Sequence, residues 1–469
     1  MEKDLWRLGV ADLARAIREK TVSSREVIKS HLDRIEAVNA KVNAVTVVLA
    51  EEALKAADEA DRALVRGESL GPLHGIPVTI KENIDLMGSA TSQGVAALKD
   101  ALPPQDAPHI SHLKRAGAIP IGRTNLPDMG LRWHTDNALR GATRNPWNRL
   151  RTTGGSSGGE GAAIATGMSP LGIGNDYGGS LRYPAQCCGI VSIRPTMGRV
   201  PQASSLDPFE MPLTAQLFLV QGPMGRHVQD LRLALKVMMA PHSRDPWWTP
   251  APQEGPALRK PIRVAVAIDP CGQGVDQGVA AGVRKAAQTL SDAGYEIEEV
   301  EPPSIEQAAK LWAELAFAEI RVVFLPLLKA AASPAAIESL MLTEAMVPKG
   351  DLLSYMNGLA ERNRIGREWA QFAEQHPLIL GPISTMPPFE VGYDLAGVAE
   401  AGELRRSMRL VTTVNLLGLP SVAVPVGVTD GLPQGVQIIG PRYREDLCLE
   451  AAEAIEERVG VLTPIDPKS

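Results

Sequence analysis

The stretch TTGGSSGGEG at residues 152–161 is the most unusual part of this 469-residue sequence. A second stretch of the same kind, GNDYGGSLR, follows at residues 174–182. Glycines that flank serines indicate backbone that approaches another group closely or takes φ values that other residues avoid. A flexible linker would not recur beside small apolar residues, and the GKS or GKT ending of a Walker-type phosphate loop is absent. The two stretches therefore indicate a site built around serines.

The pattern G-x-S-x-G, typical of a nucleophile elbow, occurs twice here, at residues 154–158 and 155–159. Any stretch rich in glycine and serine produces this pattern by chance. An elbow also needs a strand directly before it, and residues 149–152 (RLRT) do not have the composition of one. The sequence therefore does not predict an elbow.

Strand and helix patterns alternate along the rest of the chain. Ser23 and Glu26 have the spacing of a capping box at the start of a helix. Further helices are predicted over 51–66, 107–116, 159–167, 279–293, much of 303–375 and from 445 onward. Strands are predicted over 76–81, 119–122, 262–268, 296–300, 420–428 and 434–439. This alternation predicts an α/β protein with a mixed or mostly parallel sheet.

Composition argues against several classes of partner. The formal net charge is −6 and no Lys/Arg-rich run occurs, so binding to nucleic acid or to an anionic membrane surface is not expected. The N-terminal 20 residues lack the apolar core of a secretory signal, and no apolar run reaches the roughly 20 residues of a membrane helix. The four cysteines do not suggest a disulfide framework. We expect a cytoplasmic protein with no membrane contact.

Several long motifs resemble the amidase signature family, in the family's order and spacing. The resemblance is carried by GPLHGIPVTIKENID (71–85), GRTNLPDMG (122–130), GATRNPWN (141–148), the segment 154–200 from GGSSGGEG to TMGRV, QGPMGRHVQDL (221–231) and LPSVAVPVGVTDGLPQGVQIIG (419–440). It implies a single three-layer α/β/α domain with a mixed central sheet. Within it we expect an N-terminal helical segment (1–66), catalytic core motifs (70–230), a variable substrate-side region (231–410) and C-terminal core strands with a helix (411–469).

The resemblance implies a catalytic set of Lys81, Ser156 and Ser180, with a cis peptide bond before Ser156 and with Ser180 as nucleophile. The chemistry of these residue types agrees. A serine hydroxyl needs a base within hydrogen-bond reach, and no histidine lies in a matching segment near the serines. A lysine that ends the apolar run IPVTI can lose its proton near neutral pH if burial lowers its pKa.

Neighbouring residues take supporting roles by the same resemblance. Backbone N–H groups of the loop before and at the nucleophile are expected to form the oxyanion hole, namely those of Tyr177, Gly178, Gly179 and Ser180. Ser157 is expected to hydrogen-bond the lysine. Asp176 and Arg182 are expected to brace the loop as an ion pair.

Other residues are weaker candidates. Pocket lining is a hypothesis for aromatic and apolar residues near the motifs, with core packing as the alternative: Trp133, His134, Phe209, Met211 and Leu213. His109 and His112 are three residues apart, but two histidines without a third ligand are more typical of a solvated helix face than of a metal site. Cys187 and Cys188 are expected in the core. No metal and no organic cofactor are expected.

The predicted function is hydrolysis of the C–N bond of a small aryl or alkyl carboxamide through an acyl-enzyme on Ser180. Hydrolysis of carbamates or urethanes, hydrazides or aryl esters by the same residues stays open, because the leaving group depends on pocket shape. The family's tRNA-dependent amidotransferase subunit is disfavoured: it commonly has a glutamine two residues after the arginine that follows the nucleophile, whereas this segment reads SLRYPAQ, with Tyr183 next to Arg182. A non-catalytic scaffold would not need all three catalytic residues. The partner is a small amide substrate, and the resemblance allows a homodimer.

Overall fold

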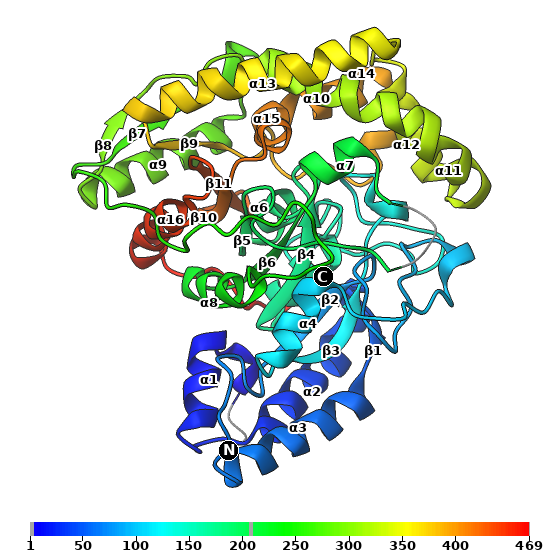
Figure 1. Cartoon of the computed structure of the whole chain (residues 1–469), viewed down its shortest axis with the longest axis vertical. Coiled ribbons are helices and arrows are strands. Elements are labelled where there is room, and N and C mark those ends of the chain that lie inside the picture. The colour runs from blue at the N-terminus through cyan, green and yellow to red at the C-terminus, as the bar shows by residue number, and fades with distance from the viewer. Residues whose placement is uncertain (1–3, 206–209, 469) are drawn as a thin grey trace.

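A computed structural model describes residues 4–205 and 210–468. Within these residues one mixed sheet of eleven strands runs through the molecule in the order β1-β3-β2-β4-β6-β5-β10-β11-β9-β7-β8 (Figure 1). The strands are β1 (Val45–Val48), β2 (Pro77–Lys81), β3 (Ile119–Thr124), β4 (Leu171–Asp176), β5 (Val191–Arg194), β6 (Val220–Gly225), β7 (Arg263–Val266), β8 (Glu296–Glu298), β9 (Leu378–Pro382), β10 (Ser421–Thr429) and β11 (Leu432–Ile439).

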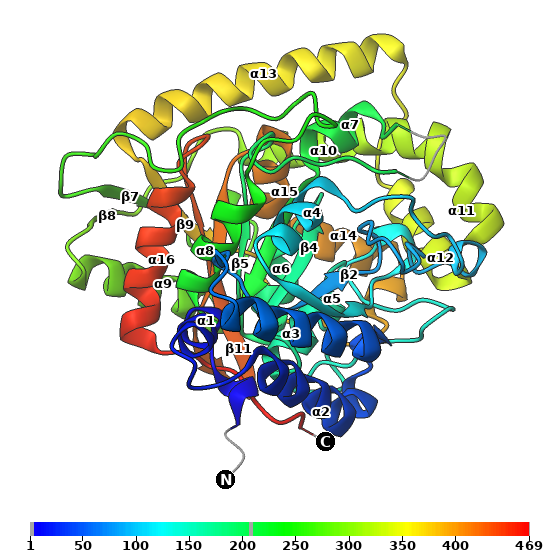
Figure 2. The ribbon, with the colours of Figure 1, turned by 60° about the horizontal axis from the view of Figure 1, so that its bottom comes forward.

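Helices cover both faces of the sheet, which confirms the predicted α/β class. They are α1 (Val10–Arg18), α2 (Ser24–Val42), α3 (Ala50–Val65), α4 (Pro108–Arg115), α5 (Gly158–Ala165), α6 (Arg182–Cys188), α7 (Leu213–Phe218), α8 (Val228–Met238), α9 (Gln277–Asp292), α10 (Ile305–Glu319), α11 (Leu325–Ala331), α12 (Pro334–Glu344), α13 (Leu352–Gln375), α14 (Val398–Ser407), α15 (Arg409–Leu417) and α16 (Glu445–Val459). In Figures 1 and 2 the N-terminal helices α1–α3 lie at one end of the molecule and α13 runs along the other.

The centre of the sheet holds the segments singled out by the sequence. Strand β2 pairs in parallel with β3 on one side and β4 on the other, and all five of its residues are buried. Beyond β4 the pairing becomes antiparallel through β6, β5, β10, β11 and β9. The sheet is therefore mixed, and Lys81 leaves it at the end of a fully covered strand.

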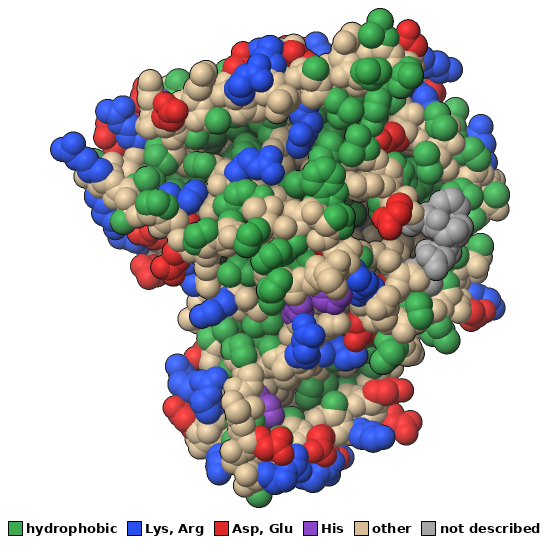
Figure 3. Space-filling view, in the orientation of Figure 1, with side chains coloured by type: hydrophobic (Ala, Val, Ile, Leu, Met, Phe, Trp, Pro, Cys, Tyr) green, Lys and Arg blue, Asp and Glu red, His purple; other side chains and the backbone are tan. Residues whose placement is uncertain are grey.

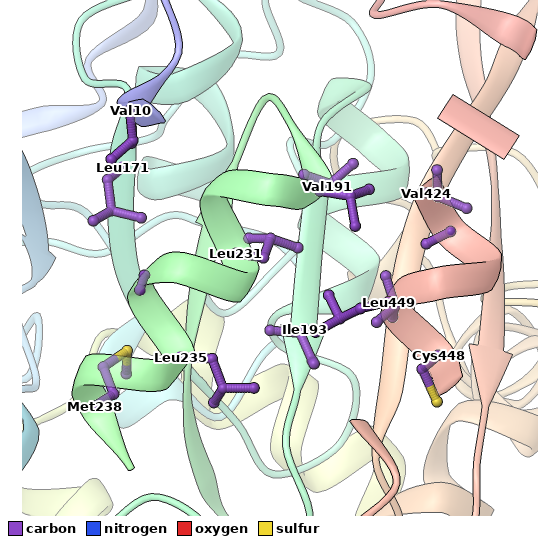
Figure 4. Packing of buried hydrophobic residues seen from close by; sticks show 14 of the residues in the cluster. Val10, Leu171, Val191, Ile193, Leu231, Leu235, Met238, Val424, Cys448 and Leu449 are labelled. Atoms are coloured by element: carbon purple, nitrogen blue, oxygen red, sulfur yellow. The ribbon is translucent and has the colours of Figure 1, made fainter. Parts of the chain in front are cut away.

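One large apolar cluster fills the space between the sheet and the helices on one face. Leu231 and Leu235 of α8 and Leu449 of α16 pack toward Val191 and Ile193 of β5 and Val424 of β10 (Figure 4). The opposite face of the sheet is also covered by apolar side chains. They belong to two further buried clusters, to which helices α6, α10 and α15 contribute. All residues of β4, β5 and β6 are buried, including polar ones such as Ser192 and Arg194, because these strands are covered on both sides.

Local sequence signals account for the start of α2 but not for the surroundings of α4. Ser23 accepts from the backbone of Glu26, whose side chain in turn accepts from the Ser23 N–H at 2.7 Å, so the predicted capping box is present at the start of α2. The prediction of a solvated face for α4 is wrong: His109 and His112 are both buried, because α4 packs against α8.

The surface seen in Figure 3 carries Lys and Arg side chains interspersed with Asp and Glu over the N-terminal helices and over α13. In the described part of the chain no helix is long and apolar enough to span a membrane.

Candidate active site

Lys81 is completely buried at the end of β2. Its Nζ lies 2.7 Å from Ser156 Oγ and 2.7 Å from Asn175 Oδ1. Burial lowers the pKa of the ammonium group to about 7, although the nearby carboxylates of Asp176 and Glu160 act to raise it. A lysine with this pKa is about half neutral at neutral pH, so a substantial share of it is available as a base.

Ser156 belongs to the loop that leads into α5, and the Gly155–Ser156 peptide bond is cis. The loop fits closely between other segments: a Cβ added at Gly154 would lie 2.8 Å from the backbone of Pro184 in α6. Ser157 Oγ donates to the Asn175 carbonyl oxygen at 3.4 Å, which ties the loop to β4. The loop thereby holds the Ser156 hydroxyl against Lys81 and beside the segment that carries Ser180.

The expected hydrogen bond from Ser157 to Lys81 is wrong. Among the described residues, the hydrogen-bond partners of Lys81 Nζ are Ser156 and Asn175, and the Ser157 hydroxyl turns toward the Asn175 carbonyl instead. Asn175, which sequence reasoning did not select, takes the place expected for Ser157. It lies inside the GNDYGGSLR motif, but nothing in the motif distinguishes a ligand of the lysine from an ordinary strand residue.

Ser180 lies in the loop between β4 and α6 and is 6% exposed. Gly179 has φ +100°, a conformation that L side chains rarely adopt, so this position requires glycine. Its N–H donates to Asp176 Oδ1 at 2.7 Å and the N–H of Leu181 donates to Asp176 Oδ2 at 3.2 Å. Gly179 is therefore already satisfied, which corrects the expectation that all four N–H groups of the loop face the oxyanion.

A buried ion pair braces this loop. Arg182 Nε donates to Asp176 Oδ2 at 3.0 Å, and both side chains are fully buried. Asn415 of α15 donates to the same carboxylate at 2.8 Å, while Arg182 also donates to Gln437 of β11 at 2.8 Å. Despite desolvation, the neighbouring cations Arg182 and Arg194 hold the pKa of Asp176 well below its usual range. The predicted Asp176–Arg182 pair is present.

Glu160 is a second buried carboxyl group near the lysine. It accepts from Thr79 Oγ1 at 2.6 Å and from Thr124 Oγ1 at 2.7 Å. Thr79 precedes Lys81 by two residues on β2, and Thr124 pairs with Lys81 in the sheet. The Glu160 carboxyl group therefore lies close to the buried end of β2 that carries Lys81. Burial raises the pKa of Glu160 to about 7, against the hydrogen bonds from the two threonines.

The candidate pocket residues have different environments. Trp133 is half-buried and donates from its indole nitrogen to the Gly178 carbonyl at 2.9 Å. His134 is buried with Nδ1 3.0 Å from Thr152 Oγ1, a packed interior position. Met211 and Leu213 are each 37% exposed at the start of α7. Phe209 lies outside the described residues.

Cys187 and Cys188 are completely buried in α6 and unpaired, as expected for core residues. In the described ranges no group of three or more His, Cys, Asp or Glu side chains is arranged to hold a metal ion.

Comparison with known proteins shows which family the chain is similar to. The sequence model of the Amidase family matches residues 26–449. An indoleacetamide hydrolase of Bradyrhizobium diazoefficiens is 44% identical over 459 residues, covering 98% of this chain and 88% of that protein. A glutamyl-tRNA(Gln) amidotransferase subunit of Moorella thermoacetica is 33% identical, with 97% of each chain covered.

Solved structures give the same result. A 6-aminohexanoate cyclic dimer hydrolase bound to its substrate superposes with a TM-score of 0.84 at 26% identity, covering 99% of each chain. A bacterial aryl acylamidase of the amidase signature family superposes with a TM-score of 0.81 at 26% identity, covering 96% of each chain. The chain therefore belongs to the amidase signature family. It is an amidase, a hydrolase of carbon–nitrogen bonds other than peptide bonds.

Proposed function

We propose that this amidase hydrolyses a small arylacetamide, with indole-3-acetamide as the first candidate, by means of Ser180, Ser156 and Lys81. The observation that carries the proposal is the 2.7 Å hydrogen bond between buried Lys81 and the Ser156 hydroxyl, within a site where the lysine has a pKa of about 7. The choice of substrate is supported by the 44% identity to a protein named indoleacetamide hydrolase, which exceeds the 33% identity to the amidotransferase protein.

Acylation begins when Ser180 Oγ attacks the amide carbon. The Ser180 proton passes to Ser156, and the Ser156 proton passes to neutral Lys81. Negative charge develops on the former carbonyl oxygen, where N–H groups of the loop before Ser180 stabilise it. When the tetrahedral intermediate collapses, the carbon–nitrogen bond breaks and the nitrogen takes a proton back through Ser156. Ammonia leaves from a primary amide, and the acyl group stays on Ser180.

Deacylation reverses the roles. Water attacks the ester carbon and gives up its proton through Ser156 to Lys81. Collapse of the second tetrahedral intermediate returns a proton to Ser180 and releases the carboxylic acid. No step in this cycle requires a group beyond the three side chains, the loop N–H groups and water.

The test is product formation by the purified protein with indole-3-acetamide, phenylacetamide, acetanilide, a phenyl carbamate, a phenylacetyl hydrazide and p-nitrophenyl acetate. We expect the highest kcat/KM for one of the two arylacetamides, and no turnover of any substrate by Ser180→Ala. A preference for the carbamate, hydrazide or ester would overturn the substrate assignment while keeping the catalytic residues. Activity that persists in Ser180→Ala would overturn the nucleophile.

A further inference from the structure

Two tryptophans bond consecutive carbonyl groups of the loop before Ser180. Trp312 Nε1 donates to the Tyr177 carbonyl oxygen at 3.1 Å, and Trp133 Nε1 donates to the Gly178 carbonyl oxygen at 2.9 Å. Trp312 comes from α10, in a region where the sequence offers no motif. Both indole N–H groups are thus used by the protein backbone rather than left free for a ligand.

These bonds fix the direction of the neighbouring N–H groups. In a trans peptide the C=O and the N–H point in opposite directions from one plane. Because Trp312 holds the Tyr177 carbonyl, the Gly178 N–H points away from α10. Because Trp133 holds the Gly178 carbonyl, the Gly179 N–H points away from Trp133, and it meets Asp176 Oδ1 at 2.7 Å. Within the described chain no hydrogen bond engages the Gly178 N–H, so this donor is available to a substrate oxygen.

Close packing reinforces the orientation. A Cβ added at Gly178 would lie 2.7 Å from Trp312 Cζ2, so the indole ring sits directly against the backbone there. On the other side, a Cβ added at Gly179 would lie 2.5 Å from Val411 Cγ1 of α15. The Tyr177 and Trp312 rings also contact each other, with centroids 5.8 Å apart. The loop therefore packs against both α10 and α15.

We propose that Trp133 and Trp312 are positioning residues that aim the Gly178 N–H at the carbonyl oxygen of the substrate during reaction at Ser180. This inference rests on the proposed function, since it assumes Ser180 as the nucleophile. The indoles contribute nothing to the ground-state binding of the substrate in this role. Their loss weakens stabilisation of the tetrahedral intermediate, and so lowers kcat more than it raises KM.

The first experiment replaces each indole by a ring without the donor, in Trp312→Phe and Trp133→Phe. Loss of an oxyanion-hole donor itself lowers kcat by about 100- to 1,000-fold. Loss of an orienting bond leaves the donor in place but less well aimed, so we expect a decrease in kcat of about tenfold with KM within about twofold. Trp369→Phe is the matched control, because Trp369 is buried in α13 and donates to the Pro303 carbonyl at 2.7 Å, away from the loop.

The second experiment separates the lost hydrogen bond from altered packing. Site-specific incorporation of β-(3-benzothienyl)alanine at position 312 keeps the bicyclic ring and replaces only its N–H by sulfur. Inhibition by benzylboronic acid gives a second readout, because its tetrahedral adduct with a serine places an oxygen where the oxyanion forms. We expect its Ki to rise by the same factor by which kcat falls, while the Kd of phenylacetate, a product-like ligand, is unchanged.

The results discriminate among the explanations. The proposal would be overturned if the benzothienyl variant had the kcat and Ki of the wild type. It would also be overturned if KM rose while kcat stayed unchanged, because that result would assign the indoles to substrate binding. An equal loss of activity in Trp369→Phe would overturn it in favour of general destabilisation. Turnover by Ser180→Ala would instead refute the proposed function, so the two failures are distinguishable.

Discussion

The pKa of Lys81 predicts how activity responds to pH. If the lysine is the base, the reactive enzyme is the form in which Lys81 is neutral. With a pKa of about 7, roughly one tenth of the enzyme is in this form at about pH 6 and roughly nine tenths at about pH 8. With the ordinary lysine pKa of 10.5, only about one molecule in 3,000 would be neutral at about pH 7. The difference between these two pKa values is caused by the burial of Lys81 at the end of β2.

The assay is kcat/KM for indole-3-acetamide from about pH 5 to about pH 9, which reports the titration of groups in the free enzyme. We expect kcat/KM to fall about tenfold for each pH unit below 7 and to reach a plateau above about pH 8. Incubation at each pH followed by assay at about pH 8 controls for unfolding.

Two carboxylates face the lysine, and one of them offers a check on the assignment. Asp176 and Glu160 both act to raise the pKa of Lys81. Glu160→Gln removes the negative charge that Glu160 carries when it is ionised, and keeps the shape of a side chain bonded by Thr79 and Thr124. Because burial raises the pKa of Glu160 to about 7, this charge is only partly present over the acidic limb and the expected shift is small. We therefore expect the acidic limb of the profile to move to lower pH in this variant.

A profile that stays flat down to about pH 5, or that rises only above about pH 9, would refute the assignment of Lys81 as the base. An acidic limb that disappears in Glu160→Gln, rather than moving, would show that the wild-type limb belongs to Glu160, whose own pKa is raised to about 7 by burial.

Three further changes test other parts of the structure. Asp176→Asn leaves buried Arg182 without its carboxylate and should lower the free energy of unfolding by about 3 kcal/mol in urea denaturation; an unchanged midpoint would contradict the brace. Asn175→Ala removes the 2.7 Å bond to Lys81 and should lower kcat about tenfold with little change in KM, and an effect on KM alone would contradict this role. Ser23→Ala removes the cap of α2 and should cost about 1 kcal/mol of stability with unchanged kinetics; altered kinetics would show coupling between α2 and the site.

Much of the fold could be predicted from local patterns. The apolar run ending at Lys81 predicted β2, and the spacing of Ser23 and Glu26 predicted the start of α2. The strands β4, β5 and β6 at the centre of the sheet were not predicted. The order of the strands could not be predicted this way, because β6 lies between β4 and β5, and β10 and β11 lie between β5 and β9. Pairing between segments so far apart in sequence depends on the whole fold, not on the composition of each strand.

The candidate active site, too, could be predicted from the sequence only in part. The motif residues Lys81 and Ser156 meet as predicted, whereas the partner of the lysine beyond Ser156 is Asn175 and not Ser157. That pairing depends on which hydroxyl and amide face the lysine after folding. Trp312 carried no signal at all, because an aromatic residue on an apolar helix predicts core packing, and only the three-dimensional structure brings its indole to the Tyr177 carbonyl.

The burial of His109 and His112 could not be predicted from the sequence, for a different reason. Two histidines three residues apart on a short helix, without a third metal ligand, suggested a solvated face. In the structure α8 packs on this helix, and His109 is a neutral side chain because burial lowers its pKa to about 3. Whether a helix face is covered depends on a neighbouring element that is distant in sequence.

Covalent labelling is the most direct test of the catalytic assignment. The purified protein is treated with an aryl fluorophosphonate, which forms a stable bond to an activated serine, and the modified peptide is sequenced by tandem mass spectrometry. The proposed mechanism predicts the phosphonyl group on Ser180, with labelling abolished in Ser180→Ala. A label on Ser156 or Ser157, or undiminished labelling in Ser180→Ala, would contradict it.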